Sequence, residues 1–181
     1  GSISPLSTDG DYGEEQVSLI DPTGFEVGSG ISVRDDASGG FHTTTATIIA
    51  QLDKNTFAIN KPLQADYMVA KNASAKNAFP VISAYHTENV EIEGLTIDGN
   101  RAVNQPLNGC RGAGIFFYRV NNSRIHNCIV HDYNGDGYSF QQSNDIVIEN
   151  CQSYHNSNLG FHPGSGSQRP VIRNNTANEN E

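Results

Sequence analysis

The second half of the chain repeats itself with a period of about 23 residues, and this repeat limits the possible fold more than any other feature. Three Gly-led segments begin at evenly spaced positions, Gly114, Gly137 and Gly160. A second apolar element keeps a similar spacing, in the copies V-E-I-E-G-L-T-I-D (90–98), S-R-I-H-N-C-I-V-H (123–131), I-V-I-E-N-C-Q-S-Y (146–154) and P-V-I-R-N-N-T-A-N (170–178). A period of this length, with two or three short strands per repeat, predicts a β-solenoid.

The alternation within each repeat assigns side chains to the core or to the surface, because neighbouring residues of a strand point to opposite faces. The predicted inward ladders are Ile92/Ile125/Ile148/Ile172, Leu95/Cys128/Cys151/Asn175, Ile97/Val130/Ser153/Ala177, Ile115/Tyr138/Phe161 and Phe117/Phe140. The predicted outward positions of the Gly-led strand are Phe116, Ser139 and His162, then Tyr118 and Gln141. Cys128 and Cys151 are therefore expected as buried free thiols, since parallel side chains in register do not converge as a disulfide requires.

One turn of each repeat is occupied by Gly94, Asn127, Asn150 or Asn174. Glycine and asparagine tolerate the left-handed backbone conformation better than other residues. The chain holds 20 Asn and 18 Gly, as a fold with many tight turns requires. We expect the asparagines to stack from coil to coil.

With these features the chain resembles the pectin-lyase-like superfamily of right-handed parallel β-helix proteins. The resemblance rests on I-x-N-C at Ile125 and Ile148, on the Asn turns, and on N-G-D-G-Y at 134–138, and it covers about 79–181. The fold class it implies is all-β, a right-handed parallel β-helix with an irregular strand-rich N-terminal segment. A leucine-rich repeat, the rival solenoid, would need a Leu-dominated pattern that this sequence does not have.

The N-terminal part lacks the repeat. We expect residues 1–13 to be a tag and an N-terminal arm, and residues 14–78 to form an irregular first coil with a small β excursion that caps the solenoid. The solenoid is expected over 79–181, where the fourth repeat stops before its Gly-led strand, as in a piece of a longer protein. An open last coil exposes unpaired strand edges, so a homodimer through this C-terminal coil is a further expectation.

Composition limits the partners. The formal net charge is −9, which opposes binding to the phosphates of nucleic acid. No apolar run approaches the ~20 residues that cross a bilayer, so no membrane partner is expected. The resemblance implies a polysaccharide partner and a secreted, cell-surface or periplasmic location. The expected polysaccharide is a neutral glycan, or an acidic one bridged by a cation.

An insertion marks the candidate site. The step from Ile92 to Ile125 is longer than the next two steps, to Ile148 and to Ile172, and the extra residues fall between Asp98 and Gly114. In the superfamily, the loop that enters the Gly-led strand borders the substrate groove. The predicted substrate-binding residues on this face and its loops are Arg101, Arg111, Tyr118, His131, Asp132 and His155.

The candidate catalytic residues are Asp98, Asp136 and His162. Glycoside hydrolases pair two carboxylates, and Asp136 lies in N-G-D-G, which is similar to the N-T-D-G of polygalacturonases, whose Asp is catalytic. The double-Asp motif of that family is absent, because this chain has S-N-L-G at 157–160 where it should fall. The G-H-G and R-I-K motifs are also missing.

A polysaccharide lyase instead needs a base, commonly with Ca²⁺ held by carboxylates. Asp98, Asp132 and Asp136 could hold such a cation. Arg101 or Arg111 is a poor base because arginine resists deprotonation. Histidine, at 131, 155 or 162, is the more ordinary general base.

Ordinary structural explanations stand beside these roles. N-G-D-G is good turn chemistry in any protein, and His131 and His155 are also expected on a solvated surface. The functional hypotheses are therefore a polysaccharide lyase or glycoside hydrolase, which could be inactive as this fragment, a non-catalytic glycan-binding or attachment module, and a structural spacer. The fold alone does not choose among them.

Overall fold

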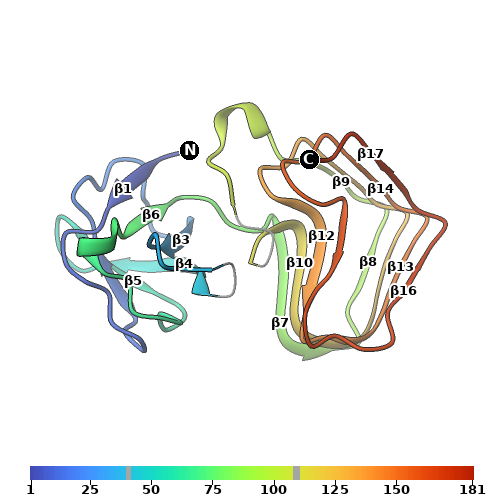
Figure 1. The fold of residues 1–181 in the computed structure, drawn as a ribbon, viewed down its shortest axis with the longest axis horizontal. Coiled ribbons are helices and arrows are strands. Elements are labelled where there is room, and N and C mark those ends of the chain that lie inside the picture. Colours follow the sequence, from blue (N-terminus) through green and yellow to red (C-terminus); the bar gives the residue numbers. More distant parts are fainter. Residues whose placement is uncertain (40–41, 108–110) are drawn as a thin grey trace. The chain divides into compact units, whose positions relative to one another are not determined.

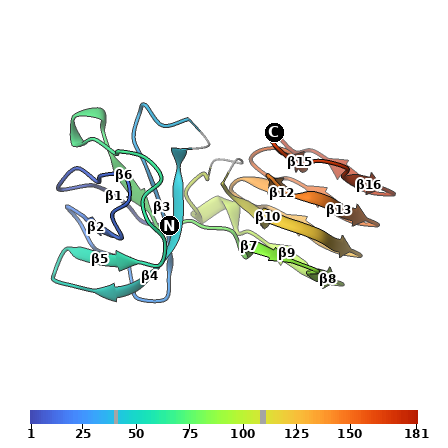
Figure 2. The ribbon, with the colours of Figure 1, turned by 90° about the horizontal axis from the view of Figure 1, so that it is seen from below.

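The computed structural model describes residues 1–39, 42–107 and 111–181, which form two compact units, residues 1–79 and residues 80–181. Figures 1 and 2 show both units. No helix in the described ranges is long and apolar enough to cross a membrane. Cys110 lies outside the described residues, whereas Cys128 and Cys151 are buried free thiols, as predicted.

The first unit is an antiparallel β structure. Its strands are β1 (Ile3–Pro5), β2 (Gln16–Ser18), β3 (Gly30–Arg34), β4 (Thr44–Gln51), β5 (Thr56–Ile59) and β6 (Ser74–Lys76). They form one sheet in the order β1-β6-β3-β4-β5-β2, and a short 3₁₀ turn, η2 (Val69–Lys71), precedes β6. Apolar residues of this unit form a core cluster of their own, in which Leu19, Ile31 and Ile48 are fully buried.

This unit differs from the expected irregular coil. All of its strand pairs in the described ranges are antiparallel, so its sheet is not built as a solenoid coil. Residues 3–5, expected in an N-terminal arm, form β1 and pair with β6. The short strands of the segment were recognisable from alternation, but alternation does not reveal which strands pair or in which direction. The capping role remains a prediction.

The second unit is a parallel β-helix. Its strands are β7 (Ile82–Glu88), β8 (Glu91–Glu93), β9 (Thr96–Asp98), β10 (Ala113–His126), β11 (Ile129–His131), β12 (Asp136–Gln141), β13 (Asn144–Glu149), β14 (Gln152–Tyr154), β15 (Phe161–Pro163), β16 (Val171–Arg173) and β17 (Thr176–Asn178). β10 is long enough to form two sides of its coil: its first half pairs with β7 and β12, and its second half with β8 and β13. The third side is the sheet β9-β11-β14-β17, and Figure 2 shows the coils stacked side by side.

The register of the stack confirms the predicted ladders. Ile125 pairs with Ile92 on one side and with Ile148 on the other, and Ile148 pairs with Ile172. The rings of Tyr138 and Phe161 stack with centroids 4.9 Å apart. Leu95, predicted to be buried, is 43% exposed, although Ile92 and Ile97 of the same coil are buried.

One turn of each coil has the left-handed backbone conformation that was predicted from its Gly or Asn residue. Gly94, Asn127, Asn150 and Asn174 all have positive φ, between 54° and 68°. These four residues occupy equivalent positions in successive coils, so the same turn is repeated from the first coil to the last.

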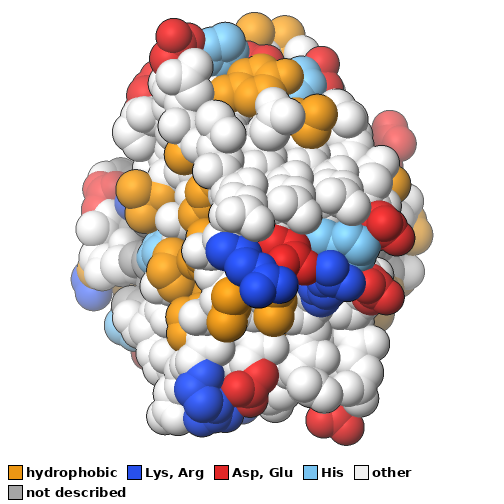
Figure 3. Space-filling model, turned by 90° about the vertical axis from the view of Figure 1, so that its right-hand side faces the viewer, with side chains coloured by type: hydrophobic (Ala, Val, Ile, Leu, Met, Phe, Trp, Pro, Cys, Tyr) orange, Lys and Arg blue, Asp and Glu red, His pale blue; other side chains and the backbone are white. Residues whose placement is uncertain are grey.

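The face formed by β8, the second half of β10, β13 and β16 carries a charged row (Figure 3). Glu149 lies at its centre, where one carboxylate oxygen accepts a hydrogen bond of 2.6 Å from Arg173 Nε and the other accepts from Arg124. These hydrogen bonds, from Arg173 first and then Arg124, hold the pKa of Glu149 below its ordinary value. In the first coil, Glu91 Oε1 lies 3.0 Å from His126 Nε2.

The isoleucine ladder gives a matched pair for testing the stack. Ile148 is 0% exposed and Ile172, in the last coil, is 38% exposed. We expect Ile148→Ala to cost about 2–5 kcal/mol of unfolding free energy, because it leaves a cavity between two coils. Ile172→Ala should cost much less, since its side chain already contacts water. Urea unfolding measures both, and equal costs would contradict the predicted stack.

The charged row predicts a pH dependence of stability. Since the folded pKa of Glu149 is lowered, its contribution is present above the unfolded value near 4.5 and is lost as the pH falls through the folded value. Glu149→Gln should therefore be less stable than the wild type at neutral pH, and this difference should shrink in acid. Denaturant unfolding at a series of pH values from neutral to acid tests this, with Glu88→Gln, an exposed acid, as the control. A difference that stays constant with pH would refute the role of the charge.

Candidate functional site

Two rows of side chains lie on the outward face of the sheet β7-β10-β12-β15. Ser83, Phe116, Ser139 and His162 form the first row, and Tyr85, Tyr118 and Gln141 form the second, as the strand register shows. We call these seven residues the β12 face. Phe116, Ser139 and Gln141 are buried, whereas Tyr118 and His162 are partly exposed. The predicted outward positions are therefore correct in register.

Asp136 and His162 form a close pair beside this face. Asp136 begins β12 and His162 lies in β15, one coil further on, and His162 Nδ1 is 2.6 Å from Asp136 Oδ2. The other carboxylate oxygen, Oδ1, accepts a hydrogen bond of 3.1 Å from the backbone N–H of Leu159. The Asp136 side chain is 1% exposed and that of His162 is 23% exposed. A buried carboxylate thus fixes the imidazole through Nδ1 and leaves Nε2 as the nitrogen for a ligand.

The second row of the face gathers cationic groups around one aromatic ring. The guanidinium carbons of Arg111 and Arg119 lie 4.9 Å and 5.3 Å from the ring centroid of Tyr118. Tyr85, one coil earlier, has its ring centroid 6.3 Å from that of Tyr118. Arginine over an aromatic ring is favourable because the ring face is electron-rich. Tyr118 therefore positions two guanidinium groups at this edge of the face.

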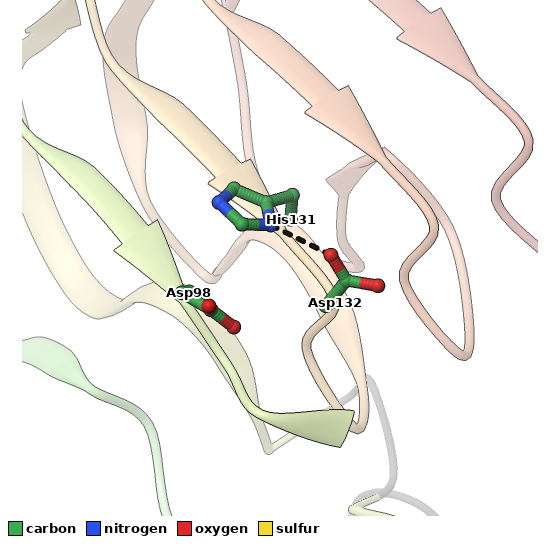
Figure 4. Close-up of side chains that lie close together, drawn as sticks. All are labelled: Asp98, His131 and Asp132. Atoms are coloured by element: carbon green, nitrogen blue, oxygen red, sulfur yellow. Dashed lines mark hydrogen bonds and ion pairs between the residues drawn. The ribbon is translucent and has the colours of Figure 1, made fainter. Parts of the chain in front are cut away.

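A second group of polar residues lies at the turn that leaves the sheet β9-β11-β14-β17 (Figure 4). His131 Nδ1 is 2.7 Å from Asp132 Oδ2, and Asp98 is the register partner of His131 in the preceding coil. One ligand atom from each of Asp98, His131 and Asp132 lies within 4.8 Å of the other two. The His131 ring stacks on Tyr154, with centroids 4.9 Å apart and planes 4° apart, which fixes its orientation.

The same turn continues through the next two coils. His155 Nε2 lies 2.5 Å from Glu179 Oε2, and its Nδ1 lies 3.9 Å from Asp132 Oδ1. Asp132, His155 and Glu179 all have left-handed backbone, with φ of 49°, 55° and 50°. Arg101 donates to the carbonyl oxygen of His155 and forms an ion pair with Glu181. Acidic and basic groups therefore alternate along this turn.

Comparison with known proteins identifies the family of the chain. The family described as a right-handed β-helix region matches residues 25–181. The chain belongs to this family. A comparison with curated proteins gives no match.

Several solved tailspikes of bacteriophages are similar in structure to this β-helix protein. They include gp49 of Pseudomonas phage LKA1 (17% identity, 97% of this chain and 33% of that chain, TM-score 0.38) and gp61 of Pseudomonas phage phi297 (11%, 98% and 33%, 0.41). A third is Gp54 of the Acinetobacter baumannii bacteriophage AP22, described in complex with a capsular saccharide (9%, 95% and 46%, 0.37). The chain thus spans only 33–46% of the length of these tailspikes.

The structure divides the predicted site residues of the β-helix into two sets. Asp136 and His162 form the buried pair, and Arg111 and Tyr118 are in contact on the same side of the coil. The other predicted residues gather at the turn after the third sheet, namely Asp98, Arg101, His131, Asp132 and His155. Asp98 and Asp136, proposed together as catalytic and metal-binding residues, belong to different sets.

Sequence reasoning missed several neighbours of the site. Tyr85 and His86 contact Tyr118, as does Arg119, and a surface hollow is lined by His86, Thr87, Glu88, Arg119 and Asn121. Tyr85 precedes Tyr118 by the same step that separates Ile92 from Ile125. The outward ladder could therefore have been extended by one earlier coil. The ion pair of His155 with Glu179 joins equivalent positions of neighbouring coils, so it could also have been predicted from the repeat.

The donor set of the turn cluster determines which cation it suits. Ca²⁺ takes six to eight oxygen ligands, whereas Asp98, His131 and Asp132 offer two carboxylates and one imidazole nitrogen. Imidazole is a ligand for zinc, nickel and copper. If a cation binds here, the donors favour a transition metal over the Ca²⁺ expected from the resemblance, and Asp136 is not among them.

A metal titration tests this cluster. We expect Zn²⁺ to raise the melting temperature of the wild type, because a ligand that binds only the folded state stabilises it. Asp98→Asn and His131→Gln should abolish the shift, and the shift should weaken at acid pH as the ligands take up protons. Asp145→Asn, at a partly exposed acid paired with Arg169, is the control. Equal shifts in all four proteins would show that the cluster is not the site.

Proposed function

We propose that the chain binds polysaccharide along the β12 face and that His162, oriented by Asp136, acts on the bound glycan as a general base. The 2.6 Å contact between His162 Nδ1 and the buried carboxylate of Asp136 carries this proposal. A neutral imidazole that donates from Nδ1 keeps Nε2 as an acceptor, which is the arrangement a general base requires. Asp136 fixes the ring and stabilises the imidazolium that forms when Nε2 takes a proton.

The geometry of the site favours a reaction that needs one general base over a reaction that needs two carboxylates. A glycoside hydrolase needs two carboxylates about 5–9.5 Å apart, and Asp98, the second candidate, lies instead with His131 and Asp132. Proton abstraction by one histidine starts a β-elimination. The C5 proton of a uronate passes to Nε2, the C5 electron pair forms a C4–C5 double bond, and the C4–O bond breaks. The departing glycosidic oxygen takes up a proton from water or from the imidazolium. We therefore place a lyase before a hydrolase.

The proposal agrees with the other features of the chain. The net charge of −9 disfavours nucleic acid, and the resemblance to the pectin-lyase-like superfamily favours polysaccharide. Arg111 and Arg119 bring cationic groups to the β12 face, where they can neutralise the carboxylate of an acidic sugar. We further propose that the protein meets this glycan outside the cytoplasm.

A glycan-binding module without catalysis is the second candidate. It is favoured by the partial burial of the pair, since a buried Asp–His hydrogen bond also stabilises a coil. The two candidates share the binding face and differ only in whether a product is released.

Substitution of the pair distinguishes these candidates. The wild type is first offered a panel of neutral, uronate-containing and capsular polysaccharides, with binding and the ultraviolet absorbance of an unsaturated product as readouts. His162→Gln should lower turnover by about 10²–10⁴-fold and change affinity little. Asp136→Asn should also lower turnover strongly, because an amide cannot hold the imidazolium. Asp145→Asn is the matched control for the loss of an acid.

Each outcome has a distinct meaning. Binding without product in the wild type would leave only the binding module. Turnover that survives in His162→Gln would exclude this histidine as the base. Failure of every glycan to bind would refute the proposed function as a whole.

A further inference from the structure

The side-chain amide of Gln141 is buried and has no hydrogen bond to any described residue. Its side chain is 0% exposed, and neither Nε2 nor Oε1 has a hydrogen-bond partner among the residues that the structure describes. Buried polar groups are almost always paired, because an unpaired one loses its bonds to water without replacement. An amide with both atoms unsatisfied therefore points to a partner that the folded chain alone does not supply.

The position of this amide places it beside the pair formed by Asp136 and His162. Gln141 follows Ser139 by two residues on the β12 face, and Ser139 is the register partner of His162. A Cβ built on Gly164 would lie 2.0–2.1 Å from the amide atoms of Gln141, so the amide occupies the space that a side chain at 164 would fill. Gly164 follows His162 by two residues, or roughly 6–7 Å of extended chain. The Cα atoms of His162 and of Gly164, against which the amide packs, are thus separated by about the width of one sugar ring.

We infer that Gln141 is a specificity-determining residue that binds a pair of adjacent hydroxyl groups on the sugar held next to His162. This inference rests on the proposed function. A primary amide presents a donor and an acceptor side by side, and two neighbouring hydroxyls can accept from Nε2 and donate to Oε1 at once. A carboxylate group of a sugar can only accept hydrogen bonds, so it would leave Oε1 of Gln141 facing another acceptor. A trans acetamido group has its N–H and C=O on opposite sides, so one such group cannot satisfy both atoms.

One short turn of the surrounding chain lies over the amide. Gly164 lies against the amide and begins a turn, Gly164–Ser167, in which Ser165 and Gly166 are exposed. The turn is joined to β12 by the hydrogen bond from Gln142 N–H to the Ser165 carbonyl, 3.0 Å. Because the Gln141 amide is fully buried, binding of a sugar to it requires that this glycine-containing turn move away from β12.

The first test measures stability and needs no ligand. Gln141→Met keeps the length of the side chain and removes both unsatisfied atoms, so its urea midpoint should rise above that of the wild type. Gln152→Met, at an exposed glutamine on β14, should leave the midpoint unchanged. A fall in the midpoint of Gln141→Met would show that the amide is bonded within the fold, and would overturn the inference.

The second test measures recognition. Oligosaccharides of neutral hexoses, uronates and N-acetylhexosamines are offered intact and after periodate cleavage of their adjacent hydroxyls. The wild type should prefer the intact form of its glycan by about tenfold or more, as expected for lost paired hydrogen bonds. Gln141→Met should bind the intact form about tenfold more weakly and should no longer distinguish the two forms. Gln141→Glu, which keeps only acceptors, should also lose the preference.

The outcomes separate this inference from the proposed function. If Gln141→Met binds glycan as the wild type does while His162→Gln loses turnover, the inference is wrong and the proposed function stands. If Gln141→Met loses the preference for the intact glycan while His162→Gln retains turnover, Gln141 binds the sugar as inferred and a residue other than His162 is the base. If the wild type binds no glycan, both are wrong.

Discussion

Parallel stacking in register is the constraint on which the rest of the second unit depends. Each residue of a coil lies about 4.8 Å from its equivalent in the next coil, so a side chain is surrounded largely by copies of its own position. Apolar positions tolerate this, and Ile92, Ile125, Ile148 and Ile172 pack as a continuous ladder. The turn positions tolerate it as well, because Asn127, Asn150 and Asn174 share the same left-handed conformation.

Charged positions cannot tolerate such repetition, because like charges one coil apart repel. The chain avoids this by alternating the sign of charge from coil to coil. Glu149 lies between Arg124 and Arg173 on one face, and His155 lies between Asp132 and Glu179 at a turn. The residues of the second row are largely exposed, where such pairs each contribute little stability. In the first row the arginines are exposed but Glu149 is buried, so its pairing contributes more. The main effect of both rows is to allow polar side chains on a surface whose register is already fixed by the core.

Positions that repeat from coil to coil could be predicted from the sequence, whereas contacts between non-repeating polar side chains could not. The repeat determines which residues stack, so the core ladders, the left-handed turns and the outward positions of β12 and β15 were all recognisable. Pairing among outward side chains depends on rotamers and on bonds that cross the register diagonally. Asp136 bonds to His162, 26 residues away, whereas Ser139 is the register partner of His162. In the first unit no repeat exists, and the antiparallel order of β1 to β6 could not be derived from short alternating strands.

The two residues that we propose to act on or bind the glycan, Asp136 and Gln141, lie where polar groups are buried at some cost in stability. Asp136 is an acid with almost no exposed surface, and it is compensated by a single histidine and one backbone N–H among the described residues. Gln141 is an amide whose hydrogen bonds are not made within the described chain, although an apolar residue would fit the same ladder at no such cost. The two ion rows satisfy their own charges within the chain, whereas the Gln141 amide on the β12 face has no partner among the described residues, which is why we propose that a sugar with adjacent hydroxyl groups binds there.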